Sequence, residues 1–94
     1  MYRIGGARIG SVNFTWPFAV LQTTKEKLVI KIFFKKFVFP KLDVKEIKEY
    51  TIIPFIGEGV QVIHSNPKYP DFIVFWYWRP KKLIQKIKEF GFIS

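Results

Sequence analysis

The chain contains no cysteine, and this absence excludes disulfide bonds, thiol catalysis and zinc sites built on thiolates. Histidine is nearly absent as well, since His64 is the single one. An imidazole without a partner base or a set of ligands serves the fold more often than a reaction. We therefore expect no metal site, no cofactor and no catalytic residues, and we predict that the protein is not an enzyme.

Long apolar runs are also missing. None approaches the roughly 18 residues that a transmembrane helix needs, and the longest candidates, at 16–21 and 72–78, have the length of a strand. The first six residues lack the apolar core of a signal peptide. These absences predict a soluble, cytoplasmic protein, with peripheral attachment to a membrane left open.

Acidic residues are scarce: seven stand against sixteen basic ones, which gives a net charge of +9. Such a charge favours anionic partners, although it can also serve only to keep an apolar protein in solution. Thirteen of the basic residues are lysine. Lysine lacks the planar guanidinium group with which arginine forms two parallel hydrogen bonds to a phosphate. The composition therefore favours weak and unselective attraction to anions.

Aromatic residues, by contrast, are abundant. The 94 residues include eleven Phe, four Tyr and three Trp, and 49% of the chain is hydrophobic. A chain of this length buries only roughly 60–65% of the surface that its unfolded form exposes. Some aromatic side chains must therefore lie outside, where large apolar patches usually mark interfaces. We expect a homo-oligomer.

Glycines, prolines and polar turn-forming residues recur at short intervals along the chain. This spacing predicts a single domain over residues 1–94 that is built mainly of strands. One helical turn is expected at 44–46, and 57–59 is expected to be a tight turn. In the expected strand at 28–34, the even-numbered residues should face the core: Leu28, Ile30, Ile32 and Phe34. The expected strands are 8–13, 14–23 with a bend or bulge at Pro17, 28–34, 37–39, 47–53, 60–64 and 72–78.

A single helix is expected to close the chain at residues 80–90. Pro80 suits its first turn, and Gly91 suits a left-handed cap at its end. The apolar stripe of this helix should pack on the sheet, because an isolated helix of this length is marginal in water. That stripe consists of Leu83, Ile84, Ile87 and Phe90.

The strand at 72–78 is apolar on both faces, so one face should have no partner inside a small domain. We place the candidate interface on this strand, at Phe75, Tyr77 and Trp78. Trp76 should share the opposite face with Phe72 and Val74, and this set should then face the core.

Four pieces of the sequence, in this order and spacing, resemble bacterial pleckstrin-homology-like (PH-like) domains of the small single-domain form. They are Trp16–Leu21, Phe37–Pro40, Gly57–His64, and Phe72–Trp76 running into Arg79-Pro80 and the helix that ends at Gly91. The resemblance implies a seven-stranded β-barrel that is capped by one C-terminal α-helix. It also implies a binding role, and some members of this family assemble into closed rings.

The resemblance points to one candidate anion site. PH domains that bind phosphoinositides carry basic residues in an early hairpin, and here the corresponding residues are Lys25, Lys27 and Lys31. No arginine lies between Arg8 and Arg79, which favours weak binding. Nucleic acid is not expected as a partner because no RNA-binding motif occurs, although phenylalanines and lysines are interleaved at 33–39.

Two functions remain after these exclusions. The first is a non-enzymatic binding or assembly module that self-associates through exposed aromatic surface. The alternative is a module that binds an anionic ligand or an acidic membrane surface weakly through lysine-rich loops.

Overall fold

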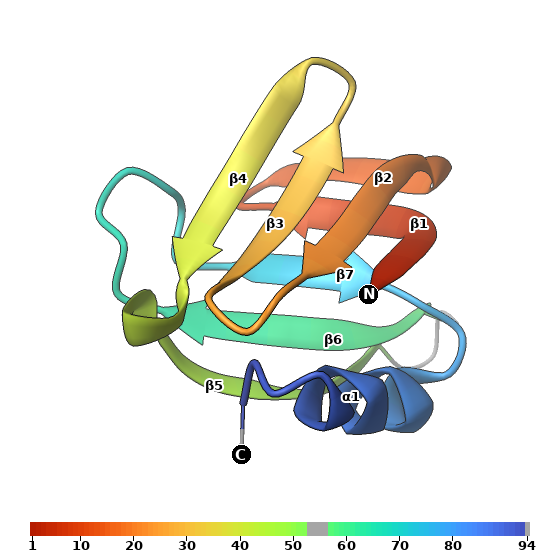
Figure 1. Ribbon diagram of the computed structural model, residues 1–94. Coiled ribbons are helices and arrows are strands. Elements are labelled where there is room, and N and C mark those ends of the chain that lie inside the picture. Colours follow the sequence, from red (N-terminus) through yellow and green to blue (C-terminus); the bar gives the residue numbers. More distant parts are fainter. Residues whose placement is uncertain (53–56, 94) are drawn as a thin grey trace.

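A computed structural model describes residues 1–52 and 57–93, and there it shows seven antiparallel strands in one sheet followed by a helix (Figure 1). This confirms the mainly β class and the closing helix. The elements are β1 (Tyr2–Ile9), β2 (Val12–Thr23), β3 (Lys27–Ile32), β4 (Lys35–Pro40), the 3₁₀ turn η1 (Lys41–Asp43), β5 (Val44–Ile52), β6 (Gly57–His64), β7 (Ile73–Trp76) and α1 (Pro80–Glu89).

The sheet is curved but open. Its strand order is β4-β3-β2-β1-β7-β6-β5, so β4 and β5 lie at the two ends and do not pair with each other. The closed barrel that we expected is therefore not confirmed. Tyr69, in the loop after β6, covers part of the gap: its hydroxyl accepts a hydrogen bond from the Val38 amide at 3.1 Å, and its ring packs against Phe37 and Phe39.

Alternation along β3 places one face in the core, as predicted. Leu28, Ile30 and Ile32 are buried. Phe34 was expected to join them, and this is wrong, because β3 ends at Ile32 and Phe34 belongs to the turn that leads into β4. Its side chain is fully exposed.

The first two strands begin earlier than the sequence pattern indicated. β1 starts at Tyr2, and the turn between β1 and β2 falls at Gly10, which has a φ of +62°. Gly5 lies inside β1 and is packed against β7: a Cβ there would stand 2.4 Å from the carbonyl oxygen of Trp76. Glycine is thus required by the close approach of two strands.

Two predictions around β5 and β6 are wrong. The helical turn expected at 44–46 is instead η1, and Val44 already begins β5. Residues 57–59 are not a turn but the start of β6, where Gly59 allows β7 to approach, since a Cβ there would lie 2.4 Å from the Phe75 carbonyl oxygen. Residue 53, predicted to end a strand, lies outside the described residues.

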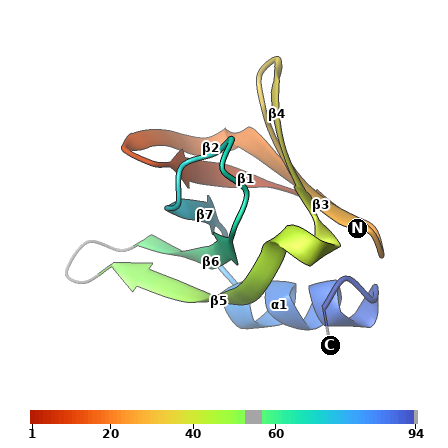
Figure 2. The same cartoon turned by 90° about the vertical axis from the view of Figure 1, so that its left-hand side faces the viewer.

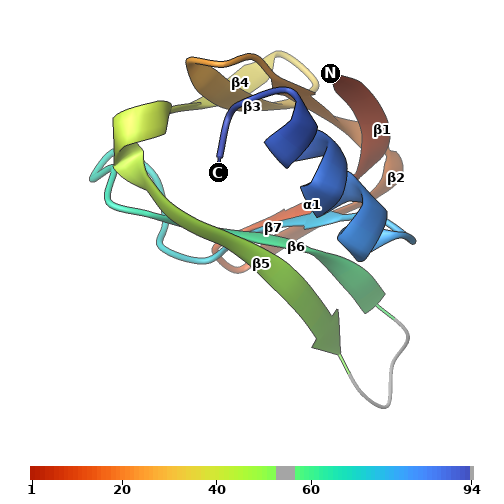
Figure 3. The same ribbon diagram turned by 60° about the horizontal axis from the view of Figure 1, so that its bottom comes forward.

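The closing helix begins at Pro80 as predicted and packs against β5 and β6 (Figure 3). Leu83 and Ile87 are buried, whereas Phe90 is about half exposed, so the predicted stripe is wrong at its last position. Gly91, with a φ of +82°, turns the chain back, and Phe92 takes the buried place. Among the described residues, no helix has the length and apolarity that crossing a membrane requires.

The helix ends in a Schellman motif. The amide of Phe92 donates to the Ile87 carbonyl at 3.3 Å, and that of Gly91 donates to the Lys88 carbonyl at 2.9 Å. This pairing of the final carbonyls normally brings an apolar contact between the two outer residues of the motif. It explains why Phe92, and not Phe90, lies in the core beside Ile87.

Candidate functional site: a tryptophan groove

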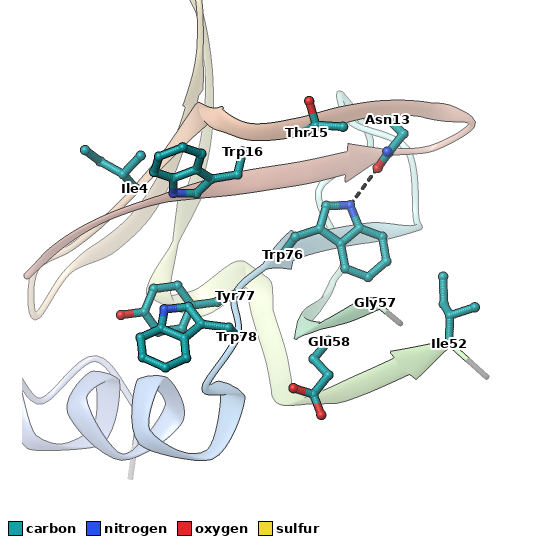
Figure 4. A pocket seen from close by; sticks show the side chains of 10 residues that line it. All are labelled: Ile4, Asn13, Thr15, Trp16, Ile52, Gly57, Glu58, Trp76, Tyr77 and Trp78. Atoms are coloured by element: carbon teal, nitrogen blue, oxygen red, sulfur yellow. Dashed lines mark hydrogen bonds between the residues drawn. The ribbon is translucent and has the colours of Figure 1, made fainter. Parts of the chain in front are cut away.

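All three tryptophans of the chain line one open cavity of about 750 Å³ (Figure 4). We call it the tryptophan groove. It lies where the β1–β2 hairpin, the end of β7 and the β5–β6 hairpin meet. Its lining residues are Ile4, Asn13, Thr15, Trp16, Ile52, Gly57, Glu58, Trp76, Tyr77 and Trp78.

Trp16 reaches the groove through a wide bulge in β2. Gly5 pairs with Ala19 and Ala7 pairs with Phe14, so the four residues Thr15–Phe18 lie opposite the single residue Gly6. Pro17 lies in this bulge, behind a cis peptide bond, as its lack of an amide donor led us to expect. The bulge pushes Trp16 outward, and 70% of its surface is exposed.

Trp76 forms the fixed wall of the groove. Its indole nitrogen donates a hydrogen bond to the Asn13 side-chain oxygen at 2.6 Å (Figure 4), and its ring packs against Tyr50. Gly57 lies close to the same ring, 3.4 Å from the position where a Cβ would stand. These contacts hold the ring in one orientation before any partner arrives, which lowers the entropic cost of binding.

Glu58 and Trp78 line the groove beside Trp76, and the charged groups at this site are the Glu58 carboxylate and the Arg79 guanidinium. The amide of Tyr77 donates to the Glu58 carbonyl at 2.9 Å, which ties the chain after β7 to the start of β6. Trp78 is 68% exposed, and the guanidinium of Arg79 lies over its ring at 4.2 Å. The groove is thus an aromatic surface with one carboxylate in its lining and one cation beside it.

The three predicted interface residues lie in different environments. Tyr77 and Trp78 line the groove, but Phe75 is fully buried, so its assignment to an interface is wrong. The reason is that β7 pairs with both β1 and β6, and the face bearing Phe75 points into the core. Sequence reasoning missed Trp16, although Pro17 had indicated a bulge beside it.

The three lysines of the predicted anion site do not converge. Lys25 lies against Gly91, beyond the end of the helix. Lys27 and Lys31 share the outer face of β3, with Cα atoms about 13 Å apart at the usual rise of a strand. None of the three lines either of the two cavities described here, the second of which, about 420 Å³, carries Lys41, Lys45 and Lys88 beside α1.

His64 is confirmed as a residue that serves the fold. It is buried, its Nδ1 accepts a hydrogen bond from the Asn66 amide at 3.0 Å, and its Nε2 therefore donates to the Pro70 carbonyl at 2.8 Å. Both ring nitrogens are engaged, and the ring packs against Phe39. Within residues 1–52 and 57–93, no group of three or more His, Cys, Asp or Glu residues could hold a metal ion.

Comparison with known proteins gives no further guide to this site. No protein-family model, no curated protein and no solved structure matches the chain.

Proposed function

We propose that this chain is a non-enzymatic binding module, PH-like in fold, that self-associates through the tryptophan groove. The observation that carries the proposal is the gathering of all three tryptophans in one open apolar site. Tryptophan is among the residues most enriched where binding energy is concentrated. Burial of apolar surface there contributes about 25 cal/mol per Å².

The distribution of charge supports a second copy of the chain as the occupant. Two molecules of net charge +9 repel each other, so they approach best through a face with little positive charge. Among the residues that the structure describes, those lining the groove include no lysine and no arginine. The seven strands followed by one helix are consistent with the PH-like fold that the sequence suggested.

The charged groups at the groove offer a reciprocal contact. In a two-fold dimer each residue that meets a partner is met in the same way by its copy. Glu58 lines the groove and Arg79 lies beside it on Trp78, so each carboxylate can face the other copy's guanidinium. Two such pairs per dimer fix the orientation of the copies more than they add affinity.

The first test is the solution mass of the protein and of two matched variants. Light scattering after size exclusion should show more than one subunit at micromolar concentration. Trp16→Ala should weaken association by about 30-fold, the effect of losing roughly 2 kcal/mol at a hot spot. Leu42→Ala removes an even more exposed apolar side chain that does not line the groove, and it should change nothing.

A charge exchange tests the orientation. Glu58→Arg and Arg79→Glu should each weaken the dimer by placing like charges together, and the double variant should recover most of the loss. If the wild-type protein is a monomer at high concentration, self-association is refuted. A dimer that is unchanged by Trp16→Ala would refute the assignment to this groove.

A further inference from the structure

The turn between β3 and β4 carries two exposed phenylalanines, one of which, Phe34, has the most exposed apolar side chain among the described residues. Phe34 is fully exposed and Phe33 is 70% exposed. The turn itself projects away from the rest of the sheet, on the side opposite α1 (Figures 1 and 2). We call Phe33 and Phe34 the hairpin tip.

Phenylalanine is an unexpected choice for this turn. Ile32 pairs with Lys35, so the loop has two residues, and Phe33 has a φ of +54°. Two-residue hairpin loops of this kind favour glycine, asparagine or aspartate, because a positive φ brings a Cβ into conflict with the backbone. The tip therefore breaks a local rule while both of its side chains stay mostly exposed, and such exceptions concentrate at functional positions.

Lysines surround the tip. Lys31 and Lys36 face each other across the β3–β4 ladder, and Lys35 follows the turn directly. From residue 28 to residue 42 the chain has no acidic side chain. Phe18, from the bulge of β2, stacks on Phe33 at a centroid distance of 5.7 Å and extends the apolar surface toward the body of the protein.

We propose that the hairpin tip docks on an acidic lipid bilayer. The two phenyl rings enter the apolar layer below the headgroups, and Lys31, Lys35 and Lys36 lie against the negative surface. A bilayer suits a convex apolar tip with a basic collar because it deforms around the tip, whereas a folded protein would need a cavity of matching shape. The attraction of about 1 kcal/mol per lysine near such a surface is unselective among acidic lipids, and each lysine then adds about fivefold to binding.

This surface differs from the lysine set that the sequence suggested. It keeps Lys31 but replaces Lys25 and Lys27, which lie at the other end of β3. It is also separate from the tryptophan groove, whose lining includes neither phenylalanine of the tip. Membrane docking and self-association can therefore be tested independently.

Sedimentation with vesicles of phosphatidylcholine, with and without phosphatidylglycerol, tests the proposal. The wild-type protein should sediment only with the acidic vesicles. The double variant Phe33→Gly, Phe34→Asn supplies residues that this turn favours, so it should stay folded and lose roughly 100-fold in binding, about tenfold for each phenylalanine. Phe34→Trp places a reporter at the tip, and brominated acyl chains should quench its fluorescence.

Two further double variants separate this site from general attraction. Lys35→Gln with Lys36→Gln should lose roughly 25-fold, whereas Lys25→Gln with Lys27→Gln removes the same charge at the other end of β3 and should lose much less. Equal losses, or full binding by the Phe33→Gly, Phe34→Asn variant, would overturn the proposal. Absence of vesicle binding, with single-stranded polynucleotide bound instead through the same residues, would assign the tip to nucleic acid and also overturn it.

Discussion

Two phenylalanines close together near the C-terminus should lose very different amounts of stability on truncation. Phe90 follows the last residue of α1 and is 49% exposed, whereas Phe92 lies beyond Gly91 and has no exposed surface. Helical periodicity would place Phe90 in the buried stripe, one turn after Ile87. Phe90→Ala and Phe92→Ala therefore form a matched pair that distinguishes the tertiary structure from the sequence pattern.

The expected sizes follow from burial. Truncating a phenylalanine inside a core costs about 3–5 kcal/mol, because transfer energy is lost and a cavity remains. Phe92 contacts the core cluster and anchors the Schellman motif through its amide, so its truncation should fall in this range. Phe90 keeps much of its surface in water in the folded state, and its truncation should cost about 1 kcal/mol or less. A domain of 94 residues has a total stability of about 5–14 kcal/mol, so the first loss is large.

Urea unfolding followed by tryptophan fluorescence measures both variants. With a denaturant slope of about 1.5 kcal/mol per M, Phe92→Ala should lower the midpoint by roughly 2–3 M and Phe90→Ala by about 0.7 M or less. Equal shifts, or a larger shift for Phe90→Ala, would refute the placement of Phe92 in the core and the motif that brings it there.

Two other predictions concern local packing. The Thr23 hydroxyl is buried and has no hydrogen-bond partner among the described residues, so Thr23→Val should stabilise the protein by about 1 kcal/mol and raise the melting temperature by about 5 °C; a lower melting temperature would show that the hydroxyl is satisfied. Gly59→Ala should cost about 2 kcal/mol, because the new Cβ would press on the backbone of Phe75, whereas Gly57→Ala meets only the Trp76 ring at 3.4 Å and should cost less. Thermal melting of both glycine variants checks that β7 passes closest to β6 at Gly59, and equal losses would contradict it.

Patterns of short range were sufficient for much of the fold. The alternation of Leu28, Ile30 and Ile32 identified the buried face of β3, and Pro80 with Gly91 bounded the helix to within one residue. These features depend on neighbours two to four positions apart, so the sequence carries them directly. The Schellman motif could have been anticipated in the same way: a glycine cap followed by an apolar residue normally packs back on the helix, and this would have exchanged Phe90 for Phe92.

Part of the candidate site was also visible in the sequence. Tyr77 and Trp78 were expected at an interface and do line the tryptophan groove. The surplus of aromatic residues predicted exposed aromatic side chains, and Trp16, Phe33, Phe34 and Trp78 are all exposed. Composition alone could not say which of them share a surface.

The remaining features of the fold and of the groove depend on the pairing of strands that lie far apart in the chain, so only the tertiary structure decided them. Phe75 is buried because β7 lies between β1 and β6, and Gly59 lies within a strand because β7 passes close to it. Trp16 lines the same groove as Trp76 and Trp78 only because β1 pairs with both β2 and β7 and so places the bulge of β2 near the end of β7. A strand has two faces and its sequence does not state which neighbours cover them, so burial on an apolar strand is fixed only when the whole sheet is assembled.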